Sequence, residues 1–142
     1  MTVAVVYPSF AVAVALFSKS SQLKTVGKIS LAPAFLGISE PLIFGVPVVL
    51  NPFVAIPWII TPMVNFVLGY LACSSGLVAK YAGVTVFNFP MVATGLLNGS
   101  ISLAVLEVAL LVIDVLIYMP FIKMQDKKYL AEEKAAVEAE HE

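Results

Sequence analysis

Glu40 is the residue whose type and position most clearly suggest chemistry, because it lies in an apolar stretch interrupted by proline and glycine. The stretch reads Leu36-Gly-Ile-Ser-Glu-Pro-Leu-Ile-Phe-Gly-Val-Pro-Val-Val-Leu-Asn51-Pro52. A carboxylate at membrane depth is costly and marks a functional site by default. Proline and glycine interrupt regular helix, and broken helices in membranes expose backbone groups that can bind ligands. The stretch therefore predicts a polar site inside an apolar environment.

The chemistry of such a site suits a ligand with many hydroxyl groups and no charge, such as a neutral sugar. The Glu40 carboxylate could accept two or more hydroxyl hydrogen bonds, and charge-assisted bonds contribute about 1.5–3 kcal/mol each. The alternative is that Glu40 caps backbone N–H groups and stabilises a turn. Asn51 precedes Pro52 where a helix should begin, so capping is favoured over ligand contact there.

Other kinds of site have little support. The chain has one histidine, His141, and one cysteine, Cys73, and it has no arginine. These residues form no metal-ligand set and no Ser/His/Asp arrangement, and no glycine-rich phosphate loop is present. We therefore expect no metal, no cofactor and no nucleic-acid partner, and a single cysteine excludes an internal disulfide.

The composition predicts an all-α integral membrane protein. The chain has 142 residues, of which 61% are hydrophobic and 12% charged, and its mean hydropathy is +1.00. That charged share is about half the usual value for a soluble domain. Several apolar runs are long enough to form membrane helices.

We expect about three transmembrane helices, a re-entrant helical hairpin and a short interfacial helix. The first helix reaches only about 25 Å, so we expect a partial or tilted span, and the chain resembles the tail end of a longer protein. A plain basic loop is nearly as consistent with the sequence of Lys19–Ile29 as an interfacial helix is. The expected segments are a partial span over Thr2–Ser18, an interfacial helix over Lys19–Ile29, the hairpin over Leu31–Pro52, full spans over Phe53–Leu77 and Ser100–Ile122, a connection over Val78–Asn98 and a charged helical tail over Lys123–Glu142.

The lysines predict the topology. Most of them form two clusters, one over residues 19–28 and one over residues 123–134, and clusters beside apolar runs face the cytoplasm. The predicted spans Phe53–Leu77 and Ser100–Ile122 lie between the two clusters, and two crossings return the chain to the same side. The stretch Leu31–Pro52 should therefore enter and leave from one side, with a turn near Ser39-Glu40-Pro41. A kinked full span is the competing interpretation.

Two further acids lie inside the last apolar run. Glu107 and Asp114 are seven residues apart, so they share one helical face. An acid near the centre of a membrane helix costs up to about 3 kcal/mol, so this face should turn toward protein or water. This face either packs against polar partners or lines a polar path for substrate or protons. Asn65, in another predicted span, should likewise form a hydrogen bond with a neighbouring helix.

Three motifs carry a resemblance to a known family. The segment Gly37-Ile-Ser-Glu-Pro-Leu-Ile-Phe-Gly-Val-Pro-Val-Val-Leu-Asn-Pro52 resembles the signature of the lactose/cellobiose/diacetylchitobiose family of enzyme IIC sugar permeases, which belong to the bacterial phosphoenolpyruvate-dependent phosphotransferase system. Ser18-Lys-Ser-Ser-Gln-Leu-Lys-Thr-Val-Gly-Lys28 is similar to the family's basic linker helix. Val115-Leu-Ile-Tyr-Met-Pro-Phe-Ile-Lys123, with Asp126 and Lys127, resembles the exit of its last span.

The resemblance implies a function and a set of partners. Residues 1–122 would be part of a membrane-embedded domain that binds and translocates a β-linked disaccharide, and residues 123–142 a charged cytoplasmic tail. The hairpin glutamate of the family maps to Glu40, so Glu40, Ser39 and Asn51 are the candidate substrate-binding residues. The partners would be the disaccharide, the bilayer, the rest of the IIC permease, a phosphocarrier IIB that phosphorylates the sugar and, indirectly, IIA. Full-length members would form homodimers in the bacterial plasma membrane.

The sequence departs from the family pattern in places, and alternatives stay open. Ser39 stands where the family usually has asparagine, and Val86-Phe-Asn-Phe-Pro90 replaces a Pro-Trp-Thr-Thr-Pro-like stretch. The resemblance covers only the C-terminal third of a family member, so we expect no transport by this chain alone and no enzymatic activity of its own. The alternatives are a stand-alone small membrane interaction protein or a non-functional remnant of a permease.

Overall fold

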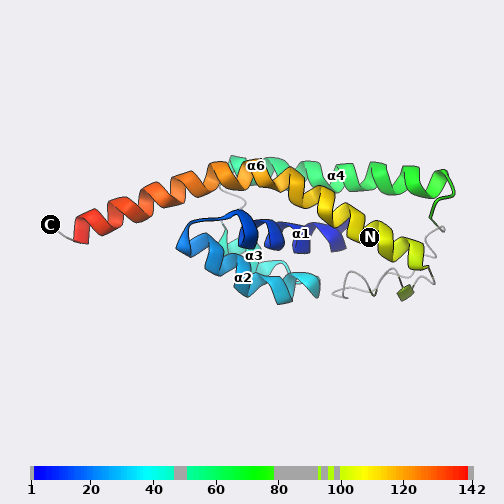
Figure 1. Ribbon diagram of the computed structural model, residues 1–142, viewed down its shortest axis with the longest axis horizontal. Helices are drawn as coiled ribbons and strands as arrows, with labels where there is room; N and C mark the ends of the chain where they lie inside the picture. The colour runs from blue at the N-terminus through cyan, green and yellow to red at the C-terminus, as the bar shows by residue number, and fades with distance from the viewer. Residues whose placement is uncertain (1, 47–50, 79–92, 94–95, 98–99, 141–142) are drawn as a thin grey trace.

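The computed structural model describes residues 2–46, 51–78, 93, 96–97 and 100–140, and the described part is helical without any strand. The long helices lie roughly side by side in an elongated bundle, from one end of which the C-terminal helix projects (Figure 1). This confirms the expected all-α class. The helices are α1 (Thr2–Phe17), α2 (Ser21–Phe35), α3 (Glu40–Gly45), α4 (Pro52–Ser74) and α6 (Ile101–Glu140).

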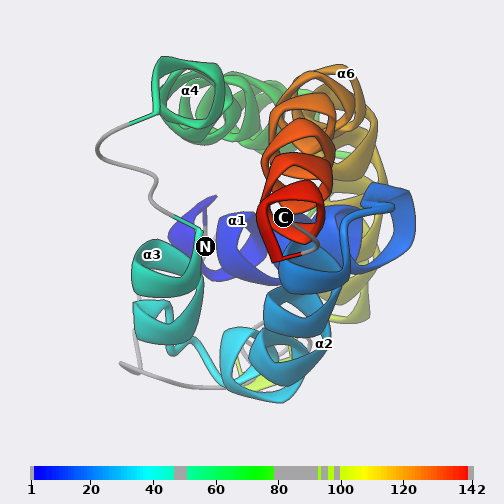
Figure 2. The same cartoon turned by 90° about the vertical axis from the view of Figure 1, so that its left-hand side faces the viewer.

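Helix α1 is the centre of the bundle and packs against α2, α4 and α6 (Figure 2). Its 16 residues give a length of about 24 Å, as expected for a partial span. Phe10 is fully buried and joins the helices through aromatic contacts. Its ring lies edge-on to Trp58 at 5.3 Å and tilted against Tyr118 at 5.0 Å between centroids. One residue of α1 therefore ties it to both α4 and α6.

Helix α2 differs from the expected short interfacial helix. It runs from Ser21 to Phe35 without a break, so the basic segment and the first arm of the hairpin form a single helix. Buried residues recur at spacings of three and four along it, which gives α2 one face that packs against α1 while Lys24 stays exposed. The prediction of a separate interfacial helix over Lys19–Ile29 was wrong because this buried face continues past Ile29. The buried residues of α2 are Leu23, Gly27, Ser30 and Ala34.

Gly27 allows α1 and α2 to approach closely. A Cβ atom added there would lie 2.7 Å from the backbone nitrogen of Ala15 and 3.0 Å from its Cα, and backbone cannot rotate away. We expect Gly27→Ala to lower the free energy of unfolding by about 1 kcal/mol despite the better helix propensity of alanine. Thermal unfolding in detergent measures the effect. The exposed neighbour Lys28→Ala introduces the same residue and should change the midpoint little; equal shifts would contradict the close contact.

The hairpin itself is present, with its turn within a few residues of the predicted position. Helix α2 ends at Phe35, Gly37 adopts a φ of 83°, and α3 begins at Glu40. Only glycine adopts this left-handed backbone without strain, which explains the glycine at the turn. Helix α3 then packs back against α2.

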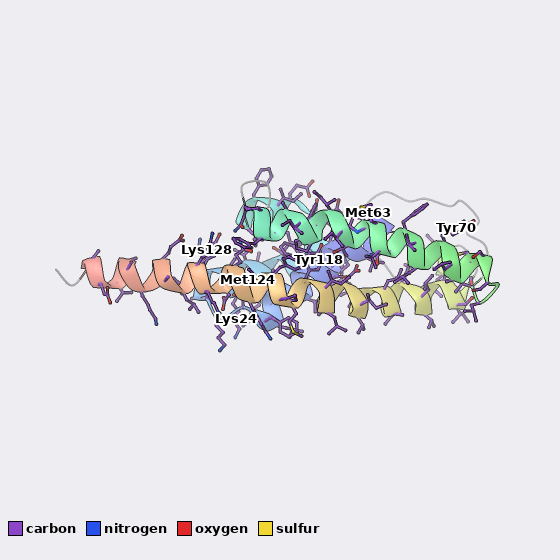
Figure 3. The ribbon with its side chains drawn as sticks, turned by 90° about the horizontal axis from the view of Figure 1, so that it is seen from above. Lys24, Met63, Tyr70, Tyr118, Met124 and Lys128 are labelled. Atoms are coloured by element: carbon purple, nitrogen blue, oxygen red, sulfur yellow. The ribbon has the colours of Figure 1, made fainter. Side chains whose placement is uncertain are left out.

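Both flanks of the hairpin contact the same part of α6. On one side the backbone N–H of Ser20 donates to Asp126 at 2.8 Å. On the other side the Lys128 Nζ lies 4.7 Å from the ring centroid of Phe53, at the start of α4. The start of α2 and the start of α4 therefore lie at the same end of the bundle. In Figure 3, Lys24 and Lys128 lie toward this end and Tyr70 lies near the other.

Helices α4 and α6 are the two described helices that are long and apolar enough to cross a membrane. Helix α4 has 23 residues and retains Pro57 and Pro62 in its interior. Helix α6 has 40 residues, or about 60 Å, and continues through the predicted span boundary at Ile122 into the charged segment. Most of the predicted connection Val78–Asn98, including residues 86–90, lies outside the described residues.

Candidate functional site

The tip of the hairpin presents a carboxylate that has no described partner and lies among apolar side chains. Ser39 occupies the N-cap position of α3, and its side chain makes no capping hydrogen bond. Glu40 is the first residue of α3 and is exposed, and its carboxylate makes no hydrogen bond or ion pair within the described part of the chain. Phe44 is 82% exposed and Ile38 is also exposed. Among the described residues, therefore, no hydrogen bond gives Glu40 or the Ser39 side chain a capping role.

Asn51 has a capping role in the structure. Its side-chain Oδ1 accepts a hydrogen bond from the backbone N–H of Phe53 at 3.1 Å, at the N-terminus of α4. This is the interpretation that the sequence favoured for Asn51. No hydrogen bond joins Asn51 to Ser39 or Glu40 among the described residues. The three candidate residues thus separate into a pair at the hairpin tip and a cap at the hairpin exit.

A buried polar cluster joins α1, α4 and α6 inside the apolar part of the bundle. The Asn65 amide donates to the Asp114 carboxylate at 2.7 Å, and the Ser9 hydroxyl lies 3.4 Å from the same oxygen. Ser9 also donates to the Val5 carbonyl at 2.6 Å. Asp114 and Glu107 are 0% and 1% exposed. The predicted inward orientation of both acids is confirmed, and Asp114 packs against polar partners.

A second polar cluster was missed by the sequence reasoning. The Asp126 carboxylate accepts hydrogen bonds from the Ser18 hydroxyl at 2.6 Å and from the backbone N–H groups of Lys19 at 2.9 Å and Ser20 at 2.8 Å. Glu133 accepts from the Ser20 hydroxyl at 2.7 Å. The usable signal was the seven-residue spacing, which places both acids on one face of α6.

These contacts change the proton affinity of two acids outside the apolar spans. Burial raises the pKa of Asp126, but hydrogen bonds from Ser18, Ser20 and Lys19 more than offset this and leave the pKa below its ordinary value. The hydrogen bond from the Ser20 hydroxyl likewise lowers the pKa of Glu133. Both carboxylates are therefore ionised at neutral pH.

The lowered pKa of Asp126 predicts how its contribution to stability depends on pH. A pKa that is lower in the folded state gives stability that is fully present above the unfolded pKa, about 3.9, and is lost as the pH falls through the folded value. We expect the difference in thermal midpoint between the native protein and Asp126→Asn to be constant from about pH 7 to pH 5 and to shrink below about pH 4. A difference that persists undiminished at about pH 3 would contradict this.

The bundle, in which two described helices are long and apolar enough to cross a membrane, has the features of a helical membrane protein. Comparison with known proteins narrows this class to a family. Residues 1–62 match the family model described as "Phosphotransferase system, EIIC". This part of the chain is therefore similar to the enzyme IIC family of the phosphotransferase system. This confirms the resemblance seen in the hairpin sequence.

Individual relatives match nearly the whole chain. The oligo-beta-mannoside-specific EIIC component of Bacillus subtilis (strain 168) is 41% identical over 94% of this chain and 30% of its own length. The cellobiose-specific EIIC component of Geobacillus stearothermophilus is 40% identical over 83% of this chain and 27% of its own length. The crystal structure of the transporter ChbC, the IIC component from the N,N'-diacetylchitobiose-specific phosphotransferase system, matches with a TM-score of 0.84 and 38% identity, over 89% of this chain and 30% of that chain. The chain thus spans about 30% of the length of these relatives.

Proposed function

We propose that this chain is part of the membrane permease of a bacterial phosphoenolpyruvate-dependent phosphotransferase system. In this role residues 1–122 belong to the domain that binds and translocates a β-linked disaccharide of the cellobiose, lactose or diacetylchitobiose class. Residues 123–142 form a cytoplasmic tail. The names of the relatives support this substrate class, because they specify cellobiose, lactose, oligo-β-mannoside and diacetylchitobiose.

The exposed Glu40 carboxylate at the hairpin tip is the observation that carries the proposal. Glu40 is exposed, lacks a described partner and lies beside exposed apolar residues that need a covering surface. A re-entrant hairpin in a membrane is tolerated only where protein covers it or where it lines a wet cavity. In a permease that cavity holds the sugar, whose hydroxyl groups donate to Glu40 and exchange hydrogen bonds with Ser39. Asn51 takes a subordinate part by fixing the start of α4.

The proposed partners follow from the same assignment. The chain acts with the rest of the IIC permease, and a phosphocarrier IIB, supplied by IIA, phosphorylates the sugar, so this chain transfers no phosphoryl group. Some relatives are named as EIICB components, which is consistent with a working contact between IIC and IIB. The assembly lies in the bacterial plasma membrane as a homodimer, crosses it several times and has the C-terminus of this chain in the cytoplasm.

Co-production with the remaining part of an enzyme IIC protein tests the proposal. We call this pair the completed permease. Uptake of a labelled β-disaccharide should appear in cells that produce both parts together with IIA and IIB, and should be absent from cells that lack this chain. A stand-alone interaction protein would instead form a stable complex that does not depend on sugar. Cells with both parts and no uptake, in the presence of such a complex, would refute the permease assignment.

A further inference from the structure

We propose that Asp126 and Glu133, on the part of α6 beyond its apolar segment, are positioning residues that set the sugar affinity of the hairpin tip. They act by fixing where α2 begins, and neither touches the sugar. The inference rests on the proposed function, because it concerns the affinity of the same site. It assigns a role to the charged extension of α6 that its sequence did not reveal.

The first step is the anchoring of the hairpin to α6. Asp126 accepts from the Ser18 hydroxyl, from the backbone N–H of Lys19 and from the backbone N–H of Ser20, all within 3.0 Å. Glu133 accepts from the backbone N–H of Gln22 at 3.2 Å, inside the first turn of α2. A helix N-terminus leaves backbone N–H groups without intrahelical partners and carries a partial positive charge. Two acids of α6 therefore act as a cap for α2.

The second step is the rigidity of the path from this cap to the tip. Helix α2 is pressed against α1 at Gly27, where backbone approaches backbone. Its far end is closed by hydrogen bonds from Gly37 N–H to the Ala34 carbonyl at 3.0 Å and from Ile38 N–H to the Pro33 carbonyl at 2.9 Å. A shift of the start of α2 along α1 is therefore passed to the turn that carries Ser39 and Glu40.

The third step is that α3 moves together with α2. A Cβ atom at Gly45 would lie 2.5 Å from a methyl carbon of Val26, so the two arms are in close contact. Leu42 of α3 is fully buried against the core. The two arms and their turn form one unit, and the acids of α6 hold this unit at its open end. The affinity for a ligand held by Glu40 must then depend on the position of α2, because hydrogen bonds weaken steeply with distance and angle.

The first test measures sugar binding by the completed permease with Asp126→Asn. We expect the dissociation constant for a β-disaccharide to rise about tenfold, which corresponds to the loss of roughly one charge-assisted hydrogen bond. Asp126→Glu retains the carboxylate and should recover most of the affinity. Glu132→Gln removes an exposed acid beside Glu133 and should leave affinity within about twofold, well under one tenfold step. The number of binding sites is measured together with the dissociation constant.

The two quantities separate positioning from simple structural support. If Asp126 only helps the protein to fold, Asp126→Asn lowers the number of sites and leaves the dissociation constant of the remaining folded protein unchanged; that outcome overturns the inference. A higher dissociation constant with a similar number of sites supports it. Glu133→Gln, which removes fewer hydrogen bonds, should raise the dissociation constant in the same direction by a smaller factor.

A second test is independent of sugar and so of the proposed function. Spin labels at Phe44 on α3 and Leu116 on α6, both exposed, report the position of the hairpin in a chain with Cys73→Ser. We expect the distance distribution to shift or broaden with Asp126→Asn and to remain unchanged with Glu132→Gln. An unchanged distribution with Asp126→Asn overturns the inference. If the native protein binds no sugar while the distribution shifts, the proposed function fails and the anchoring of the hairpin stands.

Discussion

Replacement of Glu40 by glutamine is expected to remove measurable sugar binding from the completed permease. Glutamine has nearly the same shape, but it replaces a charged acceptor by one neutral oxygen and an NH2 group that cannot accept. Two sugar hydroxyl groups would lose charge-assisted bonds, each contributing about 1.5–3 kcal/mol, and one would face a donor instead. The expected loss in affinity is at least about a hundredfold.

Isothermal titration calorimetry with a β-disaccharide measures this loss. Glu40→Asp keeps the charge on a shorter side chain and should retain weak binding. Glu138→Gln removes an exposed acid from the far end of α6 and serves as the matched control. Ser39→Asn introduces the residue that the family usually has there and should preserve binding. Native affinity in Glu40→Gln would show that the sugar binds elsewhere.

Much of the architecture is predictable because each apolar run has a physical length requirement. The boundaries of α1 and α4 lie within a few residues of the predicted ones, since Ser18 ends one apolar run and Asn51-Pro52 begins the other. The hairpin was predictable from charge, because both lysine clusters had to face one side. Contacts of Asp126 and Lys128 with the two flanks of the hairpin agree with that argument.

The parts that sequence reasoning missed depend on contacts between distant segments. Nothing local near Lys19 shows that an acid more than a hundred residues away will cap α2. Likewise, the interruption expected after Ile29 is absent because Ser30 and Ala34 continue the buried face of α2 against α1. For Glu40 the sequence left two interpretations, and no hydrogen bond in the described part of the chain gives its carboxylate a capping role. Local patterns thus predicted α1 and α4 with their boundaries, whereas packing against α1 decided the extent of α2.

Replacement of Asn65 by leucine is expected to lower the free energy of unfolding by about 3 kcal/mol. The two side chains have similar size, so the change leaves no large cavity. It removes the amide that donates to Asp114 at 2.7 Å and leaves the Ser9 hydroxyl at 3.4 Å as the remaining described donor. Hydrogen bonds between neutral groups of membrane helices contribute about 0.6 kcal/mol on average. A buried carboxyl group deprived of its partner costs more, because its desolvation is no longer offset.

The double replacement Asn65→Leu with Asp114→Leu distinguishes the cost of an unpaired carboxyl group from a general loss of packing. Removing both partners takes the Asp114 carboxyl group out of the bundle, so the double variant should recover most of the stability lost by Asn65→Leu alone. Reversible unfolding in mixed detergent micelles measures all variants, with exposed Met63→Leu on α4 as a control. A double variant as unstable as the single one would mean that the helices depend on the shape of Asn65. Recovery would instead show that the three helices pack without this cluster, and that the cost of Asn65→Leu comes from the Asp114 carboxyl group left without its amide partner.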